Sequence, residues 1–130
     1  MSIRVGVDLV PVARMRRLLA DNPGIEREIF TDGELSYCAG RRRQHEHLAA
    51  RFAAKEAVLK TLGTGLTARM GFTEVEILND SAGRPRVQLH GTVADWAVKR
   101  GLRDLDVSLS HTRDLAIAQA VAVGGTGGTG

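Results

Sequence analysis

The sequence is poor in three features, and each shortage argues against a class of protein. Cys38 is the single cysteine among 130 residues, so no disulfide can form within the chain. Aromatic residues make up only 4%, too few for the row of stacking rings with which proteins hold single-stranded nucleic acid. No apolar run is long enough to span a membrane, and no signal-peptide pattern is present. We therefore expect a cytoplasmic protein with neither a membrane nor a nucleic acid as its partner.

The remaining composition is that of a globular protein with a basic surface. The chain is 43% hydrophobic and 25% charged, and its length suits one domain with a real core. The net charge is +3 and the calculated pI is near 9.6, which favours an acidic partner: a nucleic acid, an anionic membrane, a phosphorylated ligand or an acidic protein. The charge alone does not choose among these four. A nucleic-acid-binding domain is supported only by the high pI and the arginine clusters, and steeply salt-dependent duplex binding would be its sign.

Periodicity predicts an α+β fold in a single domain over residues 1–123. The Gly/Thr tail at 124–130 has no side chains to bury, and we expect it to be disordered. Thr31 and Glu34 match a capping box at the start of a helix. The predicted elements are a strand at 3–10, a helix from Pro11 to a break at Asn22, short helices at 26–30 and from Thr31, a long helix at about 45–62, a hairpin of strands at 72–78 and 84–90, a helix at 92–100, and strands at 105–109 and 115–123.

The long helix carries the most informative group of side chains. Glu56 and Lys60 are spaced i,i+4, so both head groups emerge from nearly the same face. Lys55 falls inside the apolar stripe of this helix, where a lysine is costly unless an anion meets it or its stem reaches water. Gly63-Thr64-Gly65 then ends the helix, and a ligand could approach its backbone closely.

Two further segments offer groups for a phosphate ligand. Asp8 lies on the first strand between apolar neighbours, and together with Glu56 it would suit Mg²⁺, which takes one or two carboxylates plus phosphate oxygens and water. Taken alone, each carboxylate is better explained as a solvated side chain. Ser110 and His111 end a strand and could donate to phosphate oxygens, although a polar strand terminus is an equal interpretation. A serine hydrolase is disfavoured because no Gly-x-Ser-x-Gly elbow is present.

These blocks, taken in order, resemble the holo-acyl-carrier-protein synthase family, the small 4′-phosphopantetheinyl transferases. The resemblance covers nearly everything from Ile3 to Val123 and implies an antiparallel sheet packed against a long central helix. The segments that carry it are Val5–Val10 followed by Arg14, Phe30–Leu35, Arg51–Ala57 with Lys60 and Gly63–Gly65, Gly83–Pro85, and Val107–His111.

The resemblance implies transfer of phosphopantetheine from coenzyme A to a serine of apo acyl carrier protein, with release of adenosine 3′,5′-bisphosphate. It implies Mg²⁺ held by Asp8 and Glu56, and Glu56 and Lys60 as the catalytic groups. Glu56 or a metal-bound water would accept the serine proton. The cofactor-binding residues that it implies are Arg51, Lys55, Lys60, Gly63, Gly65, Arg84, Pro85, Ser110 and His111.

The resemblance also implies partners. Arg14 would meet acidic residues of the carrier protein, with Leu18 and Ile25 as apolar contacts. A homotrimer with active sites between subunits is implied, in which the helix ending at Leu62 from one subunit and the first strand of a neighbour would build one cleft. The alternative from a different class is a non-catalytic module that binds coenzyme A or a nucleotide with the same cations.

Overall fold

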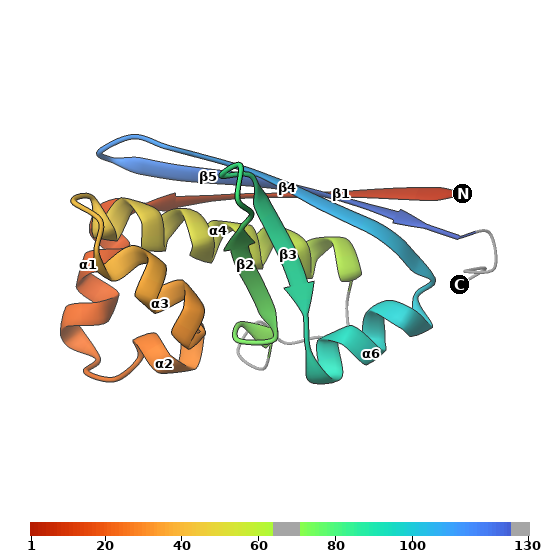
Figure 1. The fold of residues 1–130 in the computed structure, drawn as a ribbon, viewed down its shortest axis with the longest axis horizontal. Coiled ribbons are helices and arrows are strands. Elements are labelled where there is room, and N and C mark those ends of the chain that lie inside the picture. Colours follow the sequence, from red (N-terminus) through yellow and green to blue (C-terminus); the bar gives the residue numbers. More distant parts are fainter. Residues whose placement is uncertain (64–70, 126–130) are drawn as a thin grey trace.

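The longest helix, α4 (Gln44–Leu62), lies along one face of a three-stranded antiparallel sheet (Figure 1). The computed structural model describes residues 1–63 and 71–125. The sheet has the order β1-β5-β4, so β5 separates the first strand from the fourth. The other elements are β1 (Ser2–Pro11), α1 (Val12–Asp21), α2 (Glu26–Ile29), α3 (Asp32–Ala39), β2 (Val75–Asn79), β3 (Pro85–Leu89), α6 (Gly91–Lys99), β4 (Leu102–His111) and β5 (Leu115–Gly124).

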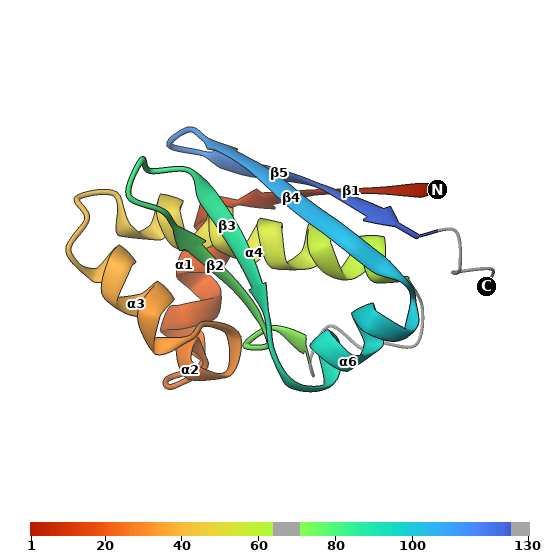
Figure 2. The same cartoon turned by 45° about the vertical axis from the view of Figure 1, so that its right-hand side comes forward.

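The β2–β3 hairpin and the short helices cover the side of α4 that faces away from the sheet. Helices α1, α2 and α3 gather near the beginning of α4, and α6 lies near its end (Figure 2). Two antiparallel sheets around a long helix confirm the predicted α+β class. Among residues 1–63 and 71–125, we find no helix with the length and apolar character needed to cross a membrane.

Small side chains are buried where α4 packs against the sheet. The helix contacts β5, and alanines of α4 that are at most 1% exposed and alanines of β5 that are at most 4% exposed are among the buried residues of these two elements. Gly6 of β1 is part of the same contact, because a Cβ atom at this position would lie 2.1 Å from the Ala57 carbonyl oxygen. The alanines are Ala50, Ala53, Ala54 and Ala57 on α4 and Ala116, Ala118, Ala120 and Ala122 on β5.

The opposite face of β1 and β5 carries large aliphatic side chains that remain exposed. We call this surface the outer face, and its side chains are 39–66% exposed. In the strand register Val5 pairs with Val121 and Leu9 with Ile117, so the aliphatic groups form a continuous patch. The outer face consists of Ile3, Val5, Val7, Leu9, Leu115, Ile117 and Val121.

Most predicted elements are present, with shifted boundaries. The capping box is confirmed, since the Thr31 hydroxyl accepts from the Glu34 amide and the Glu34 carboxylate accepts from the Thr31 amide. The strand predicted from Phe72 begins at Val75, because 71–74 form a turn in which the Val75 amide donates to the Phe72 carbonyl. The tail prediction falls mostly on residues 126–130, outside the described residues, although Gly124 is part of β5.

Candidate active site

Asp8 and Glu56 come together where β1 crosses α4. The side chains of β1 alternate, and Asp8 shares with Gly6 the face that contacts the helix. Lys60, one turn after Glu56, donates to the Val7 carbonyl at 2.8 Å and to Asp8 Oδ1 at 3.1 Å. The close approach at Gly6 therefore places the predicted carboxylates and their cation beside one another within a single chain.

The two carboxylates influence each other electrostatically. Partial burial raises the pKa of Glu56 above its ordinary value, and the negative charge of Asp8 raises it further. Lys60 and Arg14 oppose this rise with their positive charges. Asp8 retains some access to solvent, with a side chain 21% exposed. A divalent cation placed here would relieve the repulsion between the two carboxylates.

Asp8 and Glu56 could hold Mg²⁺ only if a substrate and water supplied the remaining ligands. Within residues 1–63 and 71–125 there is no cluster of three or more histidine, cysteine, aspartate or glutamate side chains that could hold a metal by itself. Two carboxylates with room for outside oxygens match the usual magnesium site, in which phosphates and waters complete the coordination. Lys60 already contacts Asp8 Oδ1, so a bound cation would compete with its ammonium group.

Three of the predicted cofactor-binding residues line a different cavity of about 170 Å³, which we call the nucleotide cavity after that prediction. Arg51, Pro85 and His111 all line it. Arg51 is 4% exposed, donates to the Asn79 side chain and stacks on the Tyr37 ring with its guanidinium carbon 4.1 Å from the ring centre. Its Nε is buried without a hydrogen-bond partner in the described structure. A fixed, incompletely satisfied guanidinium on a cavity wall is suited to an anionic ligand.

His111 is held on the other side of this cavity by a carboxylate. Its Nδ1 lies 2.9 Å from Glu46 Oε1, and the Glu46 side chain is 8% exposed. The ring of His47 stands edge-on to it, with 4.9 Å between ring centres. Burial lowers the pKa of His47, and the nearby His111, Arg51 and Arg41 lower it further, so this second imidazole favours its neutral form.

Lys55 is buried and makes contacts within the core, whereas the resemblance implied that it binds the cofactor. Its side chain is 0% exposed, and Nζ lies 2.7 Å from Glu34 Oε1. The same ammonium donates to the carbonyls of Phe72 at 2.7 Å and Val75 at 2.6 Å. The anion that a lysine on the apolar stripe requires is therefore Glu34, and all three ammonium donors are used within the core.

Three other predicted residues do not line the nucleotide cavity. Ser110 and His111 point to opposite sides of the sheet, and Ser110 lies on the exposed side beside Ile117. Arg84 extends from the hairpin to an ion pair with Asp106 on β4. Gly63 ends α4 with a φ of 87°, which favours glycine. Gly65 lies outside the described residues.

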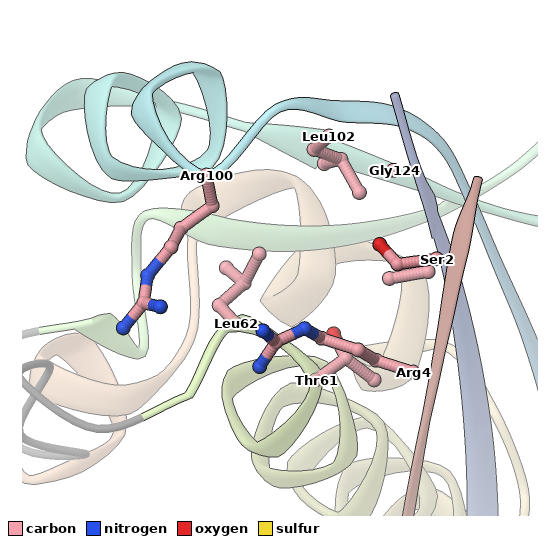
Figure 3. Close-up of a pocket in the computed structure, with 8 residues that line it drawn as sticks. Ser2, Arg4, Thr61, Leu62, Arg100, Leu102 and Gly124 are labelled. Atoms are coloured by element: carbon pink, nitrogen blue, oxygen red, sulfur yellow. The ribbon is translucent and has the colours of Figure 1, made fainter. Parts of the chain in front are cut away.

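A small cavity of about 20 Å³ lies at the end of α4 and is lined by Thr61 and Leu62 (Figure 3). The guanidinium groups of Arg4 and Arg100 extend toward this end of the helix, where cations interact favourably with the helix dipole. None of the predicted catalytic or metal-binding side chains lines this cavity.

The predicted carrier-protein contacts form a third region, on α1 and α2. Arg14 and Leu18 line a cavity of about 260 Å³, and Leu18 and Ile25 line a neighbouring one of about 340 Å³. Phe52 of α4 is shared by both cavities. The charged residues that line the two cavities are Arg14, Asp21 and Glu28. Since Arg14 also influences the pKa of Glu56, this apolar region adjoins the carboxylate pair on the side of Arg14.

The carboxylate pair and the nucleotide cavity lie on different sides of α4. At 3.6 residues per turn, Arg51 and Glu56 are separated by about 140° around the helix axis. Asp8 is on β1 and His111 on β4, the two outer strands on either side of β5. The first strand of the same chain reaches α4, so Asp8 and Glu56 meet within one chain, and a contribution of a neighbouring subunit to the cleft stays a prediction. Within one chain, the Asp8–Glu56 carboxylate pair is separated from the nucleotide cavity.

Comparison with known proteins identifies the family. The family model of the 4′-phosphopantetheinyl transferase superfamily matches residues 4–120. The chain belongs to this superfamily. It is 41% identical over 122 residues to the holo-[acyl-carrier-protein] synthase of Geobacter sulfurreducens, covering 93% of this chain and 97% of that protein. As a phosphopantetheinyl transferase by family, it belongs to the transferase class of enzymes.

Solved structures of phosphopantetheinyl transferases have the same fold. Holo-[acyl-carrier-protein] synthase from Neisseria meningitidis gives a TM-score of 0.83 at 30% identity, with 92% of this chain and 97% of that chain covered. A structure from Chronobacterium ammoniagenes, described as a complex with coenzyme A, gives 0.81 at 31% identity, with 96% and 99% covered. The predicted family resemblance is thereby confirmed.

Sequence reasoning missed four side chains that shape the nucleotide cavity of this transferase. They come from α3, α4 and β2, and all four contact Arg51 or His111 directly. One available signal was spacing, because His47 precedes Arg51 by four residues and so shares its helix face. The missed residues are Tyr37, Glu46, His47 and Asn79.

Proposed function

We propose that the protein is a holo-acyl-carrier-protein synthase that moves phosphopantetheine from coenzyme A to a serine of apo acyl carrier protein. The main support for this proposal is that Asp8, Glu56 and Lys60 lie together at the β1–α4 contact, in a chain that belongs to this superfamily. Asp8 and Glu56 would hold Mg²⁺, which would polarise the pyrophosphate and offset the charge of the leaving group. The reaction would take place in the cytoplasm.

In the proposed reaction the serine hydroxyl attacks the phosphorus that carries the pantetheine arm. A new bond forms between the serine oxygen and that phosphorus, and the phosphorus–oxygen bond of the pyrophosphate breaks, releasing adenosine 3′,5′-bisphosphate. Glu56 would receive the serine proton, because its carboxylate lies beside Asp8 and Lys60 where the serine and the pyrophosphate are proposed to meet. Lys60 turns from Asp8 to the phosphate oxygens and supplies a fixed positive charge.

The nucleotide end of coenzyme A is proposed to occupy the cavity between Arg51 and His111. The buried guanidinium with its unpartnered Nε supports an anionic ligand there. The apolar cavities beside Leu18 and Ile25 would receive apolar side chains of the carrier protein, and Arg14 at their edge would meet its acidic residues.

We also propose a homotrimer whose active sites lie between subunits. The exposed aliphatic outer face supports assembly, since monomeric proteins rarely leave such a patch in water. The separation of Glu56 from Arg51 around α4 supports a shared site, in which the carboxylates of one subunit face the nucleotide cavity of its neighbour.

An intact-mass assay tests the activity. Incubation with coenzyme A, Mg²⁺ and apo acyl carrier protein should raise the mass of the carrier by one phosphopantetheine. Glu56→Gln and Asp8→Asn should abolish the increase, whereas Asp104→Asn, which removes an exposed carboxylate of β4, should not. Coenzyme A binding without any mass change would favour the non-catalytic binding module, and normal turnover by both variants would refute the metal assignment.

Mixed assemblies test the shared site. Val5→Glu on the outer face should dissociate the trimer in analytical ultracentrifugation, whereas Val98→Glu, at a 77% exposed position of α6, should not. Inactive Asp8→Asn and His111→Ala subunits should recover activity when they are mixed and reassembled, because some sites would then combine two intact halves. Failure of the mixture to recover activity, with trimers demonstrated, would place both halves in one chain.

A further inference from the structure

Glu46 is a buried carboxylate in the first turn of α4 that is not itself among the residues lining the nucleotide cavity. It accepts a hydrogen bond from His111 Nδ1 at 2.9 Å. Its second oxygen lies 3.9 Å from Nε of Arg43, whose side chain is 70% exposed. Because an ionised carboxylate can only accept, the hydrogen of this contact belongs to the imidazole. Glu46 thus selects the ring nitrogen that carries a hydrogen in the neutral form of His111.

This contact decides which part of His111 is available to a ligand. With Nδ1 turned to Glu46, Nε2 is the nitrogen left to act on the cavity that His111 lines. The ring is further confined by His47, whose ring stands edge-on at 4.9 Å. A second proton on Nε2 would make it a donor toward phosphate, and the negative charge of Glu46 would balance the resulting imidazolium.

We propose that Glu46 is a positioning residue that orients His111 toward the phosphate at the nucleotide end of coenzyme A. The inference rests on the proposed function, which puts that phosphate in the cavity between Arg51 and His111. Glu46 does so without touching the ligand, by fixing the rotamer of the ring so that Nε2 is left for the cavity and by balancing the charge of the imidazolium that donates to phosphate. Without it, the imidazole could turn its Nε2 away or place the hydrogen of the neutral ring on either nitrogen.

A double-mutant cycle tests this role. The affinity of the full-length protein for adenosine 3′,5′-bisphosphate is measured by calorimetry for wild type, Glu46→Ala, His111→Ala and the double variant. Loss of one hydrogen bond that orients the ring should weaken binding roughly 3- to 10-fold in Glu46→Ala. The same substitution should have no further effect in the His111→Ala protein, because Glu46 acts only through that ring.

Two matched variants separate positioning from a general effect on the helix. Glu46→Gln keeps an acceptor oxygen and should restore most of the lost affinity, whereas Arg43→Ala removes only the outer partner of Glu46 and should bind like wild type. Nitrogen NMR of the His111 ring should show the hydrogen on Nδ1 in the neutral wild type and a mixture of tautomers in Glu46→Ala. All measurements are made below the unfolding temperature of the least stable variant.

The outcomes distinguish the two levels of the proposal. If wild type fails to bind the nucleotide, or His111→Ala binds as tightly as wild type, the proposed location of the nucleotide end is wrong. If His111→Ala weakens binding while Glu46→Ala does not, only the positioning role is refuted. Equal losses from Glu46→Ala with and without His111 would also refute it, because they would indicate a structural effect independent of the ring.

Discussion

Replacing Lys55 by methionine should destabilise the protein strongly while leaving its affinity for coenzyme A nearly unchanged. In the structure both Lys55 and Glu34 are 0% exposed, and their charged groups are 2.7 Å apart. Methionine removes the ammonium group and leaves the Glu34 carboxylate as an uncompensated buried charge. Two backbone carbonyls, those of Phe72 and Val75, lose their donor at the same time.

The magnitude follows from burial. Breaking a buried ion pair by removing one partner costs about 3–5 kcal/mol, a large part of the roughly 5–15 kcal/mol that stabilises an ordinary domain. For a chain of this size, the midpoint of thermal unfolding should fall on the order of 10–20 °C. The double substitution Lys55→Met with Glu34→Leu should recover part of this loss, because no isolated charge remains. Recovery is incomplete, since the Ile77 amide also loses the carboxylate that accepts from it.

The assay combines urea unfolding with coenzyme A titration, both at one fixed protomer concentration because assembly contributes to stability. Lys99→Met, at an exposed position of α6, is the matched control and should change neither quantity. A Lys55→Met protein that unfolds within about 1 kcal/mol of wild type but binds coenzyme A much more weakly would refute the structural role. That result would support the predicted role of Lys55 in cofactor binding.

Three further results are expected from single substitutions. Gly6→Ala should cost about 1–3 kcal/mol and lower activity, because the new Cβ would lie 2.1 Å from the Ala57 carbonyl oxygen; calorimetric unfolding with wild-type stability would contradict this. Glu56→Gln should be more stable than wild type at pH 7 without Mg²⁺. The raised pKa disfavours the folded carboxylate above that pKa, so the difference should vanish below 4.5, the ordinary value. His47 has a lowered pKa, so the stability it contributes is present above its ordinary 6.5 and is lost as the pH falls. His47→Phe should flatten this loss in urea unfolding between pH 5 and 7, and an unchanged slope would refute it.

Features set by neighbouring residues could be predicted from the sequence. The capping box of Thr31 and Glu34 needs only four residues, and the long helix needs only its own periodicity and the glycine at position 63. The strand around Asp8 was likewise evident from alternation. These predictions succeeded because backbone propensity and local hydrogen bonds decide them before tertiary contacts form.

Features that depend on pairing across the chain could not be predicted in the same way. The apolar stripe indicated that Lys55 requires an anion, but nothing local identified Glu34, which is 21 residues away and was already explained as a cap residue. The same carboxylate serves both purposes, accepting from the Thr31 amide and from Lys55. Glu46 was missed for a similar reason, since its partner His111 lies on a strand 65 residues later.

The distribution of small and large side chains across the sheet connects the fold to the proposed assembly. In an isolated domain the large aliphatic side chains of a sheet face the helix, because burying them contributes most to stability. Here β1 and β5 do the reverse: glycine and alanine face α4, and the large aliphatic groups face outward. The small residues allow Asp8 to reach Glu56 and Lys60, and the aliphatic outer face is left for another subunit to cover. We infer that one pattern serves both purposes, so a substitution that enlarges the inner face should impair metal binding, and one that charges the outer face should impair assembly.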